Sequence, residues 1–196
     1  LLLPAPSSLR LSEPTWLSWG GRSRKRIVEP SSAYHFYVDD SRFSRLWSRP
    51  DQLLATRAKV VVEVNYSVFE DTPFWEAVHA VGRKRWLSRY WQERGVRVVV
   101  DLNVAWRYRE LNLEGVPLGW KWYATRGYSR GAERVEREYE LARRRGGEIE
   151  MMVYGGGKKV EAIVNSGRMS GAFYVADRTT EANRERERQS WPRVLL

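Results

Sequence analysis

Runs of apolar, mostly β-branched residues alternate along the chain with longer segments in which apolar and charged residues are mixed. Two Val-rich runs, at residues 60–64 and 96–100, are the clearest, and they lack the clean polar alternation of half-exposed strands, as is typical of buried strands. Between them, residues 74–94 form the longest expected helix, with Pro73 suited to its first turn and Gly95 to its end. This order predicts two adjacent parallel strands joined by one helix.

The same patterns predict shorter elements. Strands are expected at residues 34–38, 120–127, 148–157 and 172–176, and helical segments at 39–58, 131–147 and 158–167. Because strands and helices largely alternate, we predict an α/β fold, with one domain at residues 34–176 whose mainly parallel sheet is flanked by helices. A basic Pro/Ser-rich arm with little helix or strand pattern, residues 1–33, precedes this domain, and a charged tail, residues 177–196, follows it.

Composition adds a strongly basic balance to this picture. The 196 residues include 34 Lys and Arg, 28 of them Arg, against 24 Asp and Glu, which gives a formal net charge of +10. Ten Trp and ten Tyr accompany these cations. Guanidinium groups bind phosphate, and aromatic rings stack on bases, so this composition is typical of proteins that bind single-stranded nucleic acid. The alternatives are an acidic protein partner, or a charge that serves only solubility.

Several classes of protein are excluded or disfavoured. The absence of Cys rules out disulfides, thiolate metal sites and Cys nucleophiles. The two His residues, His35 and His79, lie 44 positions apart and are expected to be structural, which excludes a His-rich metal site. The longest apolar run is too short to cross a bilayer, and the opening residues make a poor secretory signal. We therefore expect a cytoplasmic protein without membrane contact.

Polar residues, Asn65 and Asn103 among them, follow several expected strands, and the carboxyl ends of parallel strands meet at one edge of a sheet. Asp39, Asp40, Glu63 and Asp101 lie near such ends, where carboxylates can hold Mg²⁺ or Mn²⁺ for phosphodiester chemistry. Asp39, Asp40 and Asp101 are therefore candidate catalytic residues, with Mg²⁺ or Mn²⁺ as the cofactor if the chain is a nuclease. The alternative is that these carboxylates cap helices or pair with the many Arg residues.

Two further patterns suggest chemistry, each with a plainer alternative. Tyr66, like Tyr90, is a candidate nucleophile for strand transfer, although the sequence supplies no activating group and a packed Tyr is commoner. The segment Tyr-Gly-Gly-Gly-Lys-Lys at residues 154–159 follows an expected strand and resembles a turn that holds phosphate at a helix N-terminus. It lacks the Walker ending and the G-x-G-x-x-G spacing, so a plain tight turn is the alternative.

Basic and aromatic residues concentrate in three segments, residues 82–95, 106–112 and 119–130. If these segments share one edge of the sheet, they form a platform for phosphates and bases. The candidate nucleic-acid contacts, including those in the arm, are Arg22, Arg24, Lys25, Arg26, Arg83, Lys84, Arg85, Arg89, Trp106, Arg107, Arg109, Lys121, Arg126 and Arg130. The alternative is that the Trp side chains form core and the cations surround it.

The long helix carries apolar residues on three sides, so we expect it to be packed on several sides. Its four cations, Arg83, Lys84, Arg85 and Arg89, cannot all face one ligand. Helical spacing places Arg85 and Arg89 on one side, with Arg83 and Lys84 elsewhere. We therefore predict a split, in which one subset pairs with Glu or Asp inside the fold and the other faces solvent beside residues 106–109.

A family resemblance rests on four stretches, VDDSRFSRLWSRPDQ, NYSVFEDTPFWEAVHAVGRKRWLSRYWQERGVRVVVDLNV, LNLEGVPLGWKWYATRGY and VYGGGKKV. Over about residues 34–176, the chain resembles the family catalogued as domain of unknown function 4417, which is found in bacteria, phages and other mobile elements. The resemblance implies a mobile-element protein and no established chemistry. Many members read Pro-Asp-Phe-Ser where residues 64–67 are Val-Asn-Tyr-Ser, and the loss of that Asp weakens a metal site at this position.

Three hypotheses about function follow. The leading one is a DNA-binding protein of a phage or plasmid that acts in replication or maintenance of the element, with Arg and Lys on phosphates and Trp or Tyr on bases. Its partner is single- or double-stranded DNA, and host or phage replication proteins are further expected partners. The second is a metal-dependent replication initiator or nuclease. The third is an adaptor or inhibitor that binds an acidic host protein.

Overall fold

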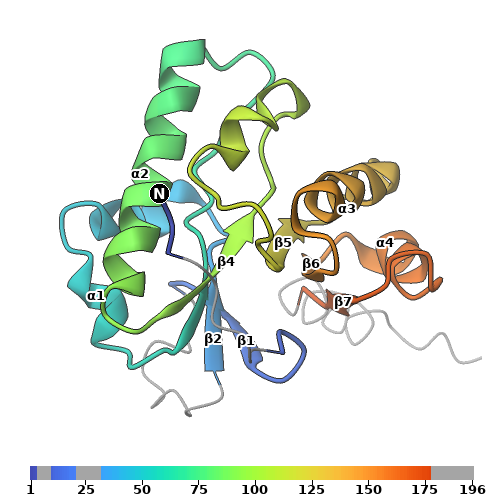
Figure 1. Cartoon of the computed structure of the whole chain (residues 1–196), viewed down its shortest axis with the longest axis horizontal. Coiled ribbons are helices and arrows are strands. Elements are labelled where there is room, and N and C mark those ends of the chain that lie inside the picture. Colours follow the sequence, from blue (N-terminus) through green and yellow to red (C-terminus); the bar gives the residue numbers. More distant parts are fainter. Residues whose placement is uncertain (4–9, 21–31, 178–196) are drawn as a thin grey trace, which may run out of the picture.

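The computed structural model describes residues 1–3, 10–20 and 32–177. Seven strands form one sheet in which each strand pairs with the next strand of the chain (Figure 1). The strands are β1 (Thr15–Ser18), β2 (Ser32–His35), β3 (Val60–Val62), β4 (Arg97–Asp101), β5 (Trp122–Arg126), β6 (Glu150–Tyr154) and β7 (Ala172–Val175). The α-helices are α1 (Asp51–Leu54), α2 (Phe74–Gln92), α3 (Ala132–Gly146) and α4 (Gly157–Val164).

The predicted unit of two parallel strands joined by the long helix is confirmed. Strands β3 and β4 pair in parallel, with Val61 opposite Val98, and α2 connects them. Helix α2 packs the buried side chains of Leu87 and Trp91 into the cluster that contains both Val residues. Every pairing among the described strands is parallel, which confirms the predicted α/β fold with its mainly parallel sheet.

The strand order decides where a site can lie. Because each strand pairs with its successor in the same direction, all the carboxyl ends of the strands lie along one edge of the sheet. Figure 1 shows α1 and α2 beside the first four strands, and α3 and α4 beside the last three. In parallel α/β folds, ligands bind in the loops that follow the carboxyl ends of the strands. We call this side the carboxyl edge.

Strand β1 lies in the segment expected to be an extended arm with little strand pattern. It pairs in parallel with β2, and both Trp16 within it and Trp19 directly after it are buried. The indole of Trp16 donates a hydrogen bond to the carbonyl of Leu11 at 3.0 Å, and the ring of Trp19 meets Tyr34 edge to face. Because β1 has only four residues and lies among Ser, Pro and Gly, its alternation of apolar and polar residues is too short to be recognised in the sequence. The basic cluster at residues 22–26 lies outside the described residues.

Helix α2 is not packed on several sides, so that prediction is wrong. One side faces the sheet, whereas Phe74, Trp75 and Trp86 are 64%, 67% and 47% exposed. The helical segment expected at residues 39–58 is also broken up, because Pro50 precedes the four residues of α1 and short 3₁₀ turns take the place of a longer helix. Packing in the core therefore does not explain why α2 carries aromatic rings at Phe74, Trp75 and Trp86.

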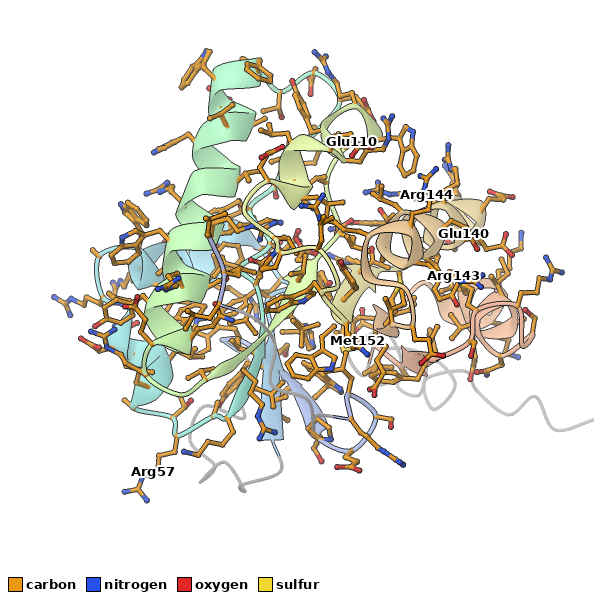
Figure 2. The ribbon with its side chains drawn as sticks, viewed as in Figure 1. Arg57, Glu110, Glu140, Arg143, Arg144 and Met152 are labelled. Carbon is orange, nitrogen blue, oxygen red and sulfur yellow. The ribbon has the colours of Figure 1, made fainter. Side chains whose placement is uncertain are left out.

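Helix α3 shows the amphipathic pattern predicted for it. Arg143 and Arg144 project from its outer side together with Glu140, whereas Met152 of the neighbouring strand β6 lies inside (Figure 2). A search of the described residues finds no helix with the length and apolar character needed to cross a membrane.

Candidate functional site

Two ion pairs are buried where strands β3 and β4 end. The ammonium group of Lys84 lies 3.1 Å from a carboxylate oxygen of Asp101, and the two side chains are 2% and 0% exposed. The other Asp101 oxygen accepts hydrogen bonds from the hydroxyl of Tyr37 at 3.1 Å and from the amide of Asn103 at 3.0 Å. Both carboxylate oxygens of Asp101 therefore have partners within the fold, where an unpaired charge is costly.

The second buried pair joins Arg85 to Glu63. The guanidinium group of Arg85 also donates to the carbonyls of Asn112 and Glu114. The inward part of the predicted split is therefore confirmed, and it consists of Lys84 and Arg85. The outer part differs from the prediction, because Arg83 lies over the rings of Trp47 and Tyr66 and Arg89 pairs with Glu93 rather than lying beside residues 106–109. Because the side chains of Lys84 and Arg85 are buried, we remove them from the candidate nucleic-acid contacts. Arg89 lies outside, paired at 2.8 Å with the half-exposed Glu93.

The carboxylates expected to share a metal ion have separate partners. Asp40 accepts hydrogen bonds from the amide and hydroxyl of Ser67, at 3.1 and 2.9 Å, while Asp101 faces Lys84. Asp39 is exposed. Within the described parts of the chain, no group of three or more His, Cys, Asp or Glu is arranged to hold a metal ion. The alternative given for these carboxylates, in which they cap helices or pair with Arg, holds for Glu63, which pairs with Arg85, whereas Asp40 pairs with Ser67 and Asp101 with Lys84.

Tyr66 lacks the features of an activated nucleophile. Its hydroxyl is buried without a hydrogen-bond partner among the described residues. Burial raises the pKa of this phenol, and the nearby cation Arg83 only partly opposes that effect. A raised pKa keeps the hydroxyl protonated, which is the opposite of what nucleophilic attack requires.

A buried carboxylate on α3 has an unusual proton affinity. Glu138 accepts hydrogen bonds from the hydroxyl of Thr125 at 2.5 Å and from the guanidinium group of Arg134 at 2.7 Å. Burial nevertheless outweighs the attraction to Arg134 and raises the pKa of Glu138 to about 7.

The side-chain amides of Asn65 and Asn103, which follow β3 and β4 and were expected at one edge of the sheet, form a hydrogen bond with each other at 3.2 Å.

An open pocket lies at the carboxyl ends of β5, β6 and β7, and we call it the carboxyl-edge pocket. Its volume is about 360 Å³, and it is lined by residues 126–129 and 155–158 together with Glu161, Tyr174 and Asp177. This volume falls within the range of roughly 300–1,000 Å³ that is typical of small-ligand sites. The site therefore lies where the fold class places ligands.

Close backbone approach shapes this pocket. Gly155, Gly156 and Gly157 have φ angles of 69°, 89° and 73°, in the left-handed region that favours Gly. A Cβ on Gly156 would lie 2.5 Å from a methyl group of Val160, and one on Gly127 would lie 2.6 Å from the carbonyl oxygen of Gly155. The two loops thus approach each other more closely than side chains allow, which explains the run of Gly residues.

The electrostatics of the pocket favour an anion. Helix α4 starts at the pocket without a side-chain cap and without an acidic residue in its first turn, which instead carries Lys158 and Lys159. Cations are unfavourable at a helix N-terminus, where unpaired N–H groups already attract negative charge. Arg126 adds a third cation from β5, while Glu161 and Asp177 also line the cavity. The Gly-Lys segment is recognisable in the sequence, but no local pattern joins it to Arg126.

Aromatic rings form a neutral layer close to the pocket. The ring centroids of His35 and Tyr154 lie 4.1 Å apart with the rings tilted by 40°, and the hydroxyl of Tyr154 donates to the pocket residue Asp177 at 3.0 Å. Burial is the main cause that lowers the pKa of His35 to about 3, while the charge of Asp177 opposes this effect and that of Arg126 adds to it. His35 is therefore uncharged at neutral pH, as expected for a structural His.

The remaining candidate contacts lie on the surface. Arg109 and Arg137 both lie over the ring of Trp106, at 4.8 and 4.9 Å from its centroid. Arg107 is exposed and donates to the carbonyl of Glu70. Lys121 and Arg130 are also exposed. Sequence reasoning missed Arg137, which lies on the charged side of α3.

Comparison with known proteins gives phage relatives. The chain is 36% identical over 80 residues to the Gene 1 protein of Mycobacterium phage D29, covering 40% of this chain and 30% of that protein. It is 31% identical over 104 residues to the Gene 1 protein of Mycobacterium phage L5, covering 50% of this chain and 44% of that protein. The matched segments thus span less than half the length of these relatives. No solved structure matches the chain.

A family match covers residues 9–120, which is more than half of the 196 residues. It takes in strands β1 to β4 and helix α2, and it includes the buried pairs of Lys84 and Arg85. The chain therefore belongs to the family described as Domain of unknown function (DUF4417).

Proposed function

We propose that this chain binds phage DNA through a phosphate held in the carboxyl-edge pocket, and that it serves replication or maintenance of the phage genome. The observation that carries the proposal is the convergence of Arg126, Lys158 and the uncapped N-terminus of α4 on one cavity. Arg126 comes from β5, whereas Lys158 and the helix terminus both belong to α4, and each of the three attracts a phosphate oxygen.

The surroundings favour nucleic acid over a small free anion. Tyr128, 42% exposed, and Tyr174 line the same cavity and offer rings on which a base can stack. The net charge of +10 attracts a long polyanion, and the relatives from phages D29 and L5 point to DNA as the polyanion at hand. Arg130, exposed in the loop that forms the pocket, extends the positive surface beyond it.

Neighbouring lysines on α4 provide a matched test. Lys158 lines the pocket, whereas Lys159 is equally exposed and does not. Lys158→Ala is expected to weaken binding to a DNA oligonucleotide about tenfold at low salt, because one charge-assisted phosphate contact is lost. The slope of log affinity against log salt is expected to fall by about 0.7–0.9. Fluorescence anisotropy over a salt series measures both quantities.

Lys159→Ala serves as the control, since it removes the same charge from the same turn. It is expected to leave the affinity close to that of the unchanged protein. Equal losses in the two variants would reduce the effect to net charge and contradict a phosphate site in the pocket. Absence of DNA binding by the unchanged protein at low salt would overturn the function as a whole.

A further inference from the structure

An unbroken series of rings and guanidinium groups runs along the outer side of α2, far in the sequence from the pocket residues. The ring centroids of Trp47 and Trp86 are 5.2 Å apart, and those of Trp86 and Tyr90 are 5.4 Å apart in a stacked arrangement. Two Arg residues extend the series. We call it the aromatic–arginine ladder, and its members are Tyr66, Arg83, Trp47, Trp86, Tyr90 and Arg94.

The ladder follows one stripe of the helix. Arg83, Trp86 and Tyr90 are separated by three and four positions, which places them above one another on α2, and Arg94 follows two residues after the helix ends. At 1.5 Å per residue, the helical part of this stripe is about 10 Å long. Trp86 is 47% exposed and Trp47 is 37% exposed, so both rings offer surface to a ligand.

The guanidinium groups in the ladder lack carboxylate partners. Arg83 lies 4.9 Å from the centroid of Trp47 and 5.5 Å from that of Tyr66, and its Nε atom has no hydrogen bond. Arg94 lies 3.5 Å from the centroid of Tyr90 and donates to the carbonyl of that residue. Neither Arg forms an ion pair within the described parts of the chain, although Arg94 is exposed and Arg83 is half-buried.

The end of the ladder at Arg83 opens into a second cavity of about 320 Å³. Tyr66, Phe69 and His79 line it together with Arg83, and Phe69 is 65% exposed. Asp40 and Glu76 also line this cavity, so it is not uniformly basic. Rings beside an unpaired cation are the arrangement that receives a base and its phosphate.

We propose that the aromatic–arginine ladder is a stacking track for single-stranded DNA. This inference rests on the proposed function and adds to it a second surface and a strand preference. Bases in a duplex stack on each other, whereas unpaired bases are free to stack on Trp and Tyr rings. The two Arg side chains supply the opposite charge to the backbone phosphates between those bases.

Charge complementarity favours this occupant over a second copy of the chain. Arg45 and Arg49, both exposed, flank Trp47 in the sequence and add to the positive charge around the ladder. The acidic residue Asp51 also lies near the ladder, where its carboxylate accepts a hydrogen bond from the hydroxyl of Tyr90 at 2.6 Å. Two copies of so basic a face would repel each other, whereas a polyanion would be attracted.

Trp86 provides the sharpest test. Trp86→Ala is expected to weaken binding to a labelled single-stranded oligothymidylate about five- to hundred-fold, because one base–ring contact is lost. Trp86→Phe keeps a ring and is expected to recover most of the affinity. Phe74→Ala removes a ring of the same helix that is more exposed than Trp86 and lies outside the ladder, and it is expected to bind like the unchanged protein. Melting temperatures verify that each variant is folded.

The outcomes separate the inference from the proposed function. If the unchanged protein binds the oligonucleotide but Trp86→Ala binds equally well, the track is wrong and the pocket proposal stands. A loss shared by Phe74→Ala, or an equal loss for duplex DNA, would also overturn the track. If Trp86→Ala abolishes self-association and leaves DNA affinity unchanged, the ladder is a contact between copies. If no DNA binds, the proposed function itself fails.

Discussion

Replacement of Lys84 by Met is expected to lower the free energy of unfolding by about 3–5 kcal/mol, because Asp101 then remains buried and charged without its counter-charge. The Asp101 side chain is 0% exposed, so water cannot take the place of the lost ammonium group. Hydrogen bonds from Tyr37 and from the Asn103 amide remain and limit the loss. Urea denaturation followed by circular dichroism measures the change.

Arg89→Met is the matched control on the same helix. Arg89 and its partner Glu93 are 40% and 50% exposed, and an exposed pair of this kind contributes at most about 1 kcal/mol. A small effect of Arg89→Met beside a large effect of Lys84→Met would establish the buried pair as the link between α2 and β4. Similar small effects in both variants would show that Asp101 finds another partner or a proton.

Acid is expected to destabilise the protein through His35. Because burial lowers the pKa of His35 from 6.5 to about 3, the unfolded chain binds one proton more than the folded chain between these pH values. The free energy of unfolding therefore falls as the pH falls through this window, by up to about 5 kcal/mol. Above pH 6.5 both states are uncharged at this residue, and the stabilisation is fully present.

The His35→Gln variant isolates this contribution, since other groups titrate in the same range. Glu138 acts in the opposite direction, because its raised pKa favours the folded state at low pH. Denaturation of the two proteins between pH 3 and 7 should give a steeper loss with acid for the unchanged chain. Parallel pH profiles would mean that the pKa of His35 is the same in the folded and the unfolded chain, and would contradict this prediction.

The sheet was predictable where hydrophobic pattern alone decides structure. The Val-rich strands β3 and β4 and the helix between them follow from run length, Pro73 and Gly95, because a buried parallel strand needs an apolar run and its connection needs a helix. Strand β1 was not predictable in this way. Its four residues are stabilised mainly by pairing with β2 and by the burial of Trp16 and Trp19, which are contacts distant in sequence.

The candidate site was predictable only in part. The strand-end rule correctly brought Asn65 and Asn103 together, and the Gly-Lys segment was identified as a phosphate-type turn. Spacing along α2 showed that its cations must divide but not that Lys84 and Arg85 reach the polar ends of β3 and β4. That depends on how deeply the helix packs on the sheet, which no local pattern records.

For a related reason, the carboxylates that were expected to share a metal ion have separate partners. Sequence places Asp40 and Asp101 at strand ends, but the fold supplies each with its own partner, a Ser67 hydroxyl and amide for one and Lys84 for the other. In a chain with 34 Lys and Arg, carboxylates near the carboxyl edge meet cations more readily than they meet each other. The stacked rings around Trp86 escaped prediction because α2 was expected to bury them.

The central claim is that the carboxyl-edge pocket holds a DNA phosphate, and amide chemical shifts test it most directly. Titration of ¹⁵N-labelled protein with a DNA oligonucleotide should move the amide resonances of Gly156, Gly157 and Lys158, which begin α4. A methylphosphonate oligonucleotide of the same sequence, whose backbone is uncharged, should leave them in place. Unmoved resonances at these three residues under saturating DNA, or equal shifts with the uncharged backbone, would contradict the account.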